Sequence, residues 1–202
     1  MFGSKGGGLT DFSGKANNCV YVARNKLANE DCMRLLVPGE EAMFLLKSRK
    51  DEFLFTDQGL IFIDGESVAS PKRTITRTNY FESKFYNIIL ITPGVMDNDF
   101  SIEFKFDKSW RLEMAKEELE NGKIVVRCLE FLSMMQSRNR QRLEQMNNAR
   151  SNNARIDVSG SGADAIAALS LDATVWANTM VDSFMPMSYK SAFEAVLGPL
   201  EK

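Results

Sequence analysis

Histidine is absent from all 202 residues of the chain. Without imidazole, the chain can form neither a Ser-His-Asp nor a Cys-His nucleophile system, and it can form no metal site that requires a histidine ligand. Paired carboxylates and lysine remain available for catalysis, but no motif arranges them as an activated nucleophile or a tuned acid–base pair. The sequence therefore predicts no enzymatic activity, no metal site and no cofactor.

Cysteine is scarce, and long hydrophobic runs are missing. The three cysteines, Cys19, Cys32 and Cys128, are odd in number and widely spaced. This pattern fits neither a disulfide framework nor a zinc site. No run of about 18 apolar residues could span a bilayer. The first residues, MFGSKGGG, lack the apolar core of a signal peptide. We expect an intracellular, cytoplasmic protein in a reducing compartment.

Charge of one sign is not in excess either. The chain has 25 basic and 27 acidic residues, which gives a net charge of −2. Such a balance exerts no long-range attraction on nucleic acid or an anionic membrane. The one local basic region, at Arg138, Arg140 and Arg142, is interrupted by Glu144 and has no aromatic side chains nearby for base stacking. We expect no nucleic-acid partner.

Glycine is concentrated in the first 18 residues, which carry few apolar side chains. Residues 1–27 are therefore expected to form a flexible N-terminal arm with room for a short helix. Asn29 is suited to cap a helix that runs from Glu30 to Leu36 and ends at Pro38-Gly39. We expect this helix to dock on the following sheet.

Short apolar segments separated by turn residues dominate the next hundred residues. Each segment has the length of one strand, and each interruption carries turn chemistry. The first three span residues 42–46, 53–55 and 60–63, with a hairpin between the second and the third. Alternation and β-branched residues predict four more, at residues 73–77, 86–92, 100–106 and 110–114. Seven short strands predict an antiparallel barrel or sandwich.

The hydrophobic period changes from two residues to about 3.6 after these strands. Apolar residues then fall on one helical face: Ile124, Cys128, Phe131, Leu132 and Met135. This spacing predicts an amphipathic helix that begins between residues 116 and 123 and ends in the high 130s.

The segment LLVPGEEAMFLLKSRKDEFLFTDQGLIFID, from Leu35 to Asp64, and the later segment YFESKF, from Tyr80 to Phe85, carry a family resemblance. They resemble the bacterial pleckstrin-homology-like domain family over roughly residues 28–136. The resemblance implies a mainly β, seven-stranded, strongly bent antiparallel barrel or sandwich capped by a C-terminal helix. It also implies ring-like self-association in some members, and no catalysis. We expect such a domain over residues 28–138, with helical extensions.

The region after this domain is expected to contain a polar linker, residues 139–162, and a C-terminal helical interaction segment, residues 163–202. The second region has an apolar seam at nearly heptad spacing around Trp176. We predict that these residues bind a partner: Ile166, Leu169, Trp176, Met180 and Phe184. The seam could equally dock on its own domain. A second helix is expected from Ser188 to Leu197, ending at Gly198-Pro199.

The charged interruption between the first two strands is a candidate anion site. Three basic residues on one loop, Lys47, Arg49 and Lys50, could hold a lipid headgroup or phosphate, although Asp51 and Glu52 follow directly. The alternative interpretation is therefore a module that makes peripheral contact with a membrane or with phosphoinositides.

The leading hypothesis is a non-catalytic protein-binding or assembly subunit, an adaptor or scaffold whose rigid domain carries the tail helix. The expected partner is another protein, a second copy of the chain, or both. This hypothesis predicts that removal of residues 163–202 abolishes assembly and leaves the barrel folded.

Overall fold

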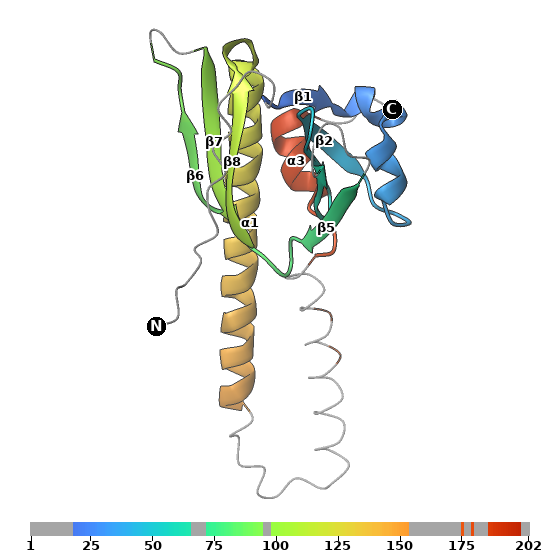
Figure 1. Cartoon of the computed structure of the whole chain (residues 1–202). Coiled ribbons are helices and arrows are strands. Elements are labelled where there is room, and N and C mark those ends of the chain that lie inside the picture. Colours follow the sequence, from blue (N-terminus) through green and yellow to red (C-terminus); the bar gives the residue numbers. More distant parts are fainter. Residues whose placement is uncertain are drawn as a thin grey trace, which may run out of the picture.

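A computed structural model of the chain describes residues 18–65, 72–94, 98–153, 175, 179 and 186–198. Eight strands in these residues form two antiparallel sheets (Figure 1). Sheet A has the strand order β1-β2-β3-β4-β5 and sheet B the order β6-β7-β8. The strands are β1 (Val20–Ala23), β2 (Ala42–Lys47), β3 (Glu52–Thr56), β4 (Gly59–Gly65), β5 (Arg73–Asn79), β6 (Tyr86–Ile91), β7 (Asp99–Phe106) and β8 (Lys108–Ala115). The predicted mainly β architecture is confirmed, and the seven predicted strands correspond to β2–β8.

Strand β1 is the additional strand and lies where the sequence predicts an arm. It pairs with β2, with Val20 opposite Lys47 and Ala23 opposite Phe44. At the same corner, the backbone N–H of Cys19 donates to the carbonyl of Glu113 in β8 at 2.6 Å, which joins sheet A to sheet B. The domain therefore begins before residue 28. Four residues are too few for a periodic pattern, and the partner strand lies about 20 residues away in sequence.

The helix predicted from Glu30 to Leu36 is wrong in type and in its cap. The structure instead has two 3-10 turns, η1 (Arg24–Asn29) and η2 (Asp31–Leu35), separated by Glu30 in an extended conformation. Neither turn has a side-chain cap. The expected docking is correct, because Leu27 and Cys32 are buried with residues of sheet A. Turns of this length are short enough to follow the curved surface of the sheet.

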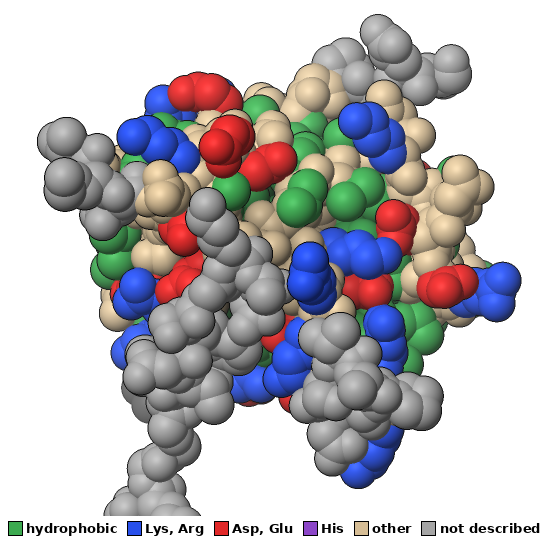
Figure 2. Space-filling view, turned by 45° about the horizontal axis from the view of Figure 1, so that its top comes forward, with side chains coloured by type: hydrophobic (Ala, Val, Ile, Leu, Met, Phe, Trp, Pro, Cys, Tyr) green, Lys and Arg blue, Asp and Glu red, His purple; other side chains and the backbone are tan. Residues whose placement is uncertain are grey.

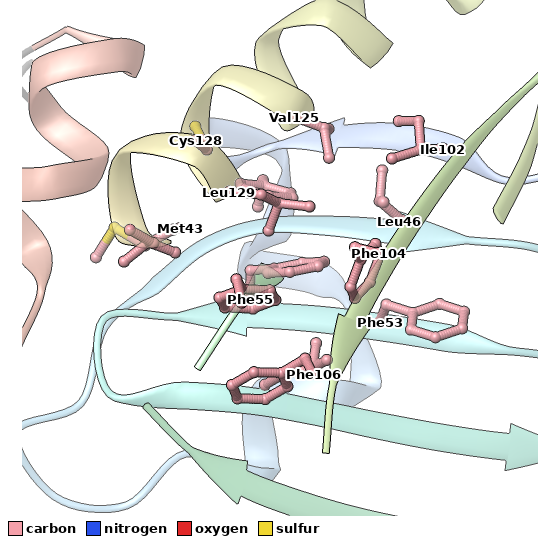
Figure 3. Close-up of a cluster of buried hydrophobic side chains, with 14 of the residues drawn as sticks. Met43, Leu46, Phe53, Phe55, Ile102, Phe104, Phe106, Val125, Cys128 and Leu129 are labelled. Atoms are coloured by element: carbon pink, nitrogen blue, oxygen red, sulfur yellow. The ribbon is translucent and has the colours of Figure 1, made fainter. Parts of the chain in front are cut away.

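Strands β2–β4 are buried on both faces, which explains their nearly continuous apolar sequences. On one face, side chains such as Leu45 and Leu54 pack beneath η1 and η2. On the other face, Phe44 and Phe55 point into the main core between the sheets and the helices. Figure 3 shows this core, where Phe53 and Phe55 of β3 lie near residues of β7 and of the long helix. Burial on two sides replaces the alternation that a half-exposed strand would show.

Helix α1 (Leu119–Asn153) follows the single 3-10 turn η3 (Lys116–Glu118). Its buried side is made by these residues: Val125, Cys128, Leu129, Leu132, Gln136 and Met146. Near its start, Gly122 lies against the ring of Phe100, and a Cβ at this position would be 2.4 Å from Phe100 Cε2. The absence of a side chain at Gly122 therefore favours the close approach of α1 to sheet B.

The predicted linker from residue 139 is wrong at its first half, because α1 continues to Asn153. The stretch is polar, but Arg, Gln, Glu, Leu and Met are good helix formers, and no glycine or proline interrupts them before residue 154. A polar composition alone is therefore no signal of a loop.

No helix in the described part of the chain is long and apolar enough to cross a membrane.

The connector between β5 and β6 is held in place by one buried side chain of α1. The Oε1 atom of Gln136 accepts the backbone N–H of Phe85 at 3.1 Å, and its Nε2 donates to the carbonyls of Tyr80 at 2.7 Å and Ser83 at 2.8 Å. Ser133 Oγ donates to the Phe85 carbonyl at 2.6 Å. These bonds satisfy buried backbone groups at the point where the chain passes from sheet A to sheet B.

Helix α3 (Lys190–Leu197) packs on sheet A and beside α1. The predicted helix and its end are confirmed, since Gly198 follows the last residue with φ of 86°. Its start is two residues later than predicted: Tyr189 is the N-cap residue and provides no side-chain cap, and Ser188 Oγ accepts the N–H of Lys190 at 3.2 Å. Phe193 is fully buried, with its ring 6.0 Å from that of Phe44. The Tyr189 N–H donates to the carbonyl of Asp57 at 2.6 Å. This part of the tail is therefore a component of the domain core.

Candidate interaction surface

The turn at Pro38-Gly39 positions a buried carboxylate, that of Glu40. Gly39 has φ of 84°, and Glu40 follows it, two residues before β2 begins at Ala42. The Glu40 carboxylate accepts hydrogen bonds from Thr56 Oγ at 2.5 Å, Arg77 Nη2 at 2.5 Å and the Val37 N–H at 3.0 Å. Three donors satisfy this carboxylate. It therefore connects the turn before β2 to β3, through Thr56, and to β5, through Arg77.

Glu41 is the centre of a second group of charges, which borders a cavity of about 290 Å³ lined by η1, η2 and the start of β2. Its carboxylate pairs with Arg24 and, at 2.7 Å, with Lys190 of α3. The hydrogen bond from Lys190 is the largest of the effects that lower the pKa of Glu41. The charged groups around this small cavity are thus engaged with one another, and no activated nucleophile or acid–base pair stands among them.

Of the three predicted anion-binding residues, Arg49 and Lys50 lie on the loop between β2 and β3, whereas Lys47 is the last residue of β2. Both lysines face carboxylates. Lys47 Nζ lies 2.5 Å from Glu30 Oε2, and this hydrogen bond raises the pKa of Lys47. Lys50 Nζ lies 3.4 Å from Asp64 Oδ1, whereas Arg49 is exposed. Acidic and basic side chains are interspersed on the face shown in Figure 2. Anion binding at this loop stays a prediction, with most of its positive charge compensated locally.

The predicted partner-binding residues of the tail lie outside the residues that the structure describes. These residues are Ile166, Leu169, Trp176, Met180 and Phe184. Their role stays a prediction. The interaction segment as a whole, residues 163–202, needs one correction: its described part, residues 186–198, docks on its own domain. Truncation at residue 163 would therefore remove Phe193 from the core.

The three cysteine thiols are free and buried. Burial is the largest effect on each of them, and it raises the pKa of Cys19 and Cys128 to about 12 and that of Cys32 to about 11. A thiol in this state is a poor nucleophile. Across the described ranges, no group of three or more Cys, Asp or Glu side chains lies close enough to hold a metal ion.

The apolar side of β6 is the surface that sequence reasoning missed. Strand β6 alternates between Ile88 and Leu90, which pack partly against the core, and Tyr86, Ile89 and Ile91, which point outward. The outward side chains are 50%, 48% and 43% exposed. A residue between them, Asn87, has φ of 51° and marks a bulge in the pairing with β7. We call the three outward side chains the β6 strip.

The β6 strip lies at an edge. Within the described residues, β6 pairs only with β7, and Figure 1 shows it as the outermost strand of sheet B, on the side away from sheet A and α3. The sequence YNIILIT had indicated a strand but contained no signal of which side is covered. An uncharged run of apolar residues is typical of a buried strand, so its exposure is informative.

Comparison with known proteins agrees with this architecture. The profile of the family described as "Bacterial PH domain" matches residues 12–134. The crystal structure of a PH-domain-containing bacterial protein from Exiguobacterium sibiricum 255-15 superimposes with a TM-score of 0.81 and 22% identity, covering 90% of this chain and 100% of that one. "Uncharacterized protein YvbH" of Bacillus subtilis strain 168 is 35% identical over 91 residues, which are 45% of this chain and 45% of that protein. The match thus spans less than half the length of that relative.

Proposed function

The chain belongs to the bacterial PH domain family, and on this premise we propose that it is a non-catalytic protein-binding module that contacts another polypeptide chain through the β6 strip. The observation that carries this proposal is the exposure of Tyr86, Ile89 and Ile91 on a strand that, among the described residues, pairs with β7 alone. Large apolar side chains gathered on one edge are characteristic of interaction surfaces, whereas isolated ones are not.

The remaining surface of the described residues supports this choice by contrast. Most of the charged side chains considered above, including Glu40, Glu41 and Lys47, have partners within the molecule. A site for a charged ligand would need such groups to be available. The β6 strip presents an apolar surface on a strand that, within the described ranges, pairs with β7 alone, and these are the features that strand addition uses.

A site-specific photo-crosslinker placed at position 89, in cells that normally make the protein, tests the proposal. We expect irradiation to yield a covalent adduct of higher mass with the crosslinker in place of Ile89. The matched control has the crosslinker in place of Ile75, which is also an isoleucine, is 53% exposed and lies on β5, an edge strand of sheet A. Adducts at neither position, or equal adducts at both, would contradict the proposal.

A further inference from the structure

The cavity of about 290 Å³ between the two 3-10 turns and the start of β2 is mostly apolar. Its apolar lining combines three larger side chains with two alanines: Leu27, Met33, Leu36, Ala28 and Ala42. The charged residues of the lining are Arg24, Glu40 and Glu41. A concave apolar surface with a small number of polar groups has the usual composition of a binding site.

The local structure accounts for the open space. Glu30 is extended and separates η1 from η2, so the two turns do not continue across the sheet as one helix. Below them, the pairing of β2 with β3 shifts its register between Ala42 and Phe44. Ala28 and Ala42 then face the space with side chains of a single methyl group. The cavity is therefore a product of the backbone path and of two small residues.

The charged groups of the lining are compensated within the molecule. Glu40 accepts three hydrogen bonds, and its side chain is 0% exposed. Glu41 pairs with both Arg24 and Lys190. An ionic ligand would have to displace one of these partners, and its own charge would lose hydration in an apolar cavity. The cavity therefore favours an uncharged, apolar group.

The size and the surroundings of the cavity favour one side chain of a polypeptide over a complete small molecule. Its volume is at the lower limit of the roughly 300–1,000 Å³ found for small-molecule pockets. Apolar surface continues beside it, since Val37 is 43% exposed and donates its N–H to Glu40. Arg24 donates from Nη1 to Met43 and from Nη2 to Glu41, and a guanidinium carries five N–H donors in all. Its other donors can bind a main-chain carbonyl.

We propose that this cavity is an anchor pocket for a partner polypeptide: it takes one uncharged apolar side chain, of the size of leucine, while Arg24 donates to a main-chain carbonyl of the same segment. Met33 suits such a pocket, because its flexible thioether adapts to the shape of the side chain that enters. Apolar anchors buried in pockets supply much of the affinity of protein interfaces. The pocket belongs to sheet A and goes beyond the role proposed for the β6 strip of sheet B.

An NMR titration of the full chain, observed at the Met33 methyl group, tests the pocket. The probe is N-acetyl-leucinamide, which has the apolar side chain and two peptide groups. We expect a saturable shift with a Kd in the millimolar range. The amide of N-acetyl-glutamate, whose side chain is charged, should cause no saturable shift. A titration with N-acetyl-leucinamide that shows no saturation up to about 50 mM, or equal binding of the two probes, would overturn the proposal.

A pair of tryptophan variants locates the binding. Ala28 is an exposed lining residue of η1, so Ala28→Trp fills the cavity from outside the core and should weaken binding of the probe at least about tenfold. Asn29→Trp adds the same side chain at the next exposed position, outside the lining, and should bind as wild type. Equal affinities of the two variants would refute the location.

The variant Arg24→Lys tests the carbonyl contact and does not depend on the fold of Ala28→Trp. Lysine keeps the positive charge beside Glu41 but lacks the planar set of donors. It should weaken N-acetyl-leucinamide several-fold. It should leave unchanged the binding of isobutanol, which has the apolar group without peptide groups. If isobutanol bound the wild-type protein as tightly as N-acetyl-leucinamide, the occupant would be a small apolar molecule, and the polypeptide partner would be refuted.

Discussion

The two sheets of the molecule are covered in different ways. Sheet A is buried on both faces of β2–β4, under η1 and η2 on one side and against the main core and α3 on the other. Sheet B has one face against the core, whereas the outward side chains of β6 remain half-exposed. Sheet A is thus covered by segments that precede its central strands in sequence, η1 and η2, and by one that follows them, α3. Among the described residues the chain leaves the edge of sheet B uncovered, which is where we expect a partner.

Replacement of Phe193 by Ala is the strongest test of this comparison, because Phe193 is the side chain through which α3 enters the core beside Phe44 and Tyr80. Loss of a fully buried aromatic ring should lower the free energy of unfolding by about 3–5 kcal/mol. Denaturant unfolding measures the loss, with Ser191→Ala on the exposed side of the same helix as the control. If the two variants were equally stable, sheet A would not depend on α3.

The variant Gln136→Ala examines the junction between the sheets. Three backbone groups of the connector would lose their partner, and each unsatisfied buried group costs about 1–3 kcal/mol. Some of these groups can recruit water, so we expect a destabilisation of at least about 2 kcal/mol. Gln141→Ala, on the exposed side of α1, is the matched control. Equal unfolding midpoints for the two variants would show that the connector is held by its apolar side chains alone.

The variant Gly122→Ala tests how closely α1 packs against the buried face of sheet B. The added methyl group would collide with the Phe100 ring, at a cost of about 1–3 kcal/mol, and the gain in helix propensity offsets roughly 1 kcal/mol of that cost. We expect a net loss of about 1 kcal/mol. In a Phe100→Leu background the same substitution should be neutral or stabilising, because the collision is relieved. Additive effects in this double-mutant cycle would contradict the close packing.

The smallest effect concerns the ion pair between α3 and sheet A. The Lys190 hydrogen bond lowers the pKa of Glu41 below its ordinary value of 4.5. The pair therefore contributes its full stabilisation above that pH and loses it as the pH falls through the lowered pKa. Because the Glu41 side chain is 38% exposed, we expect only a few tenths of a kcal/mol.

Thermal unfolding at two pH values measures this contribution. Glu41→Gln should lie slightly below wild type at pH 7, and the difference should shrink as the pH falls from the ordinary value of 4.5 through the lowered pKa of Glu41. Glu117→Gln, at an exposed glutamate, should match wild type throughout. A Glu41→Gln deficit that persists at low pH would indicate a packing effect instead.

The sequence predicted those features that short-range patterns determine. Alternation and turn residues located β2–β8, and the apolar residues after Lys123 located α1, with its buried stripe shifted by one position to include Val125 and Leu129. The missed features depend on contacts between distant residues. Strand β1 is a strand because it pairs with β2. Gln136 has a structural role because it bonds the backbone of a connector about 50 residues earlier.

The candidate site was predicted less well than the fold for the same reason. Whether Ile89 is covered depends on which segment lies over β6, and no local pattern encodes that. From the sequence alone, Lys47, Arg49 and Lys50 are predicted to be available to bind an anion, because Glu30, which pairs with Lys47, is 17 residues away. Conversely, the apolar stripe of α3 predicted a helix with a buried side. It did not predict that this side would pack on Phe44 and Tyr80, which form the seat of α3.

The long separation between α1 and α3 has a consequence for how sheet A is covered. Residues 154–189 lie between the end of α1 and the start of α3, so α3 is bound to its seat as a tethered ligand is. Because the chain itself joins α3 to its seat, the local concentration of α3 there is fixed. A free peptide of residues 186–198, or α3 of another molecule, would have to compete with that fixed local concentration. Occupancy of the seat is therefore independent of how much protein is present.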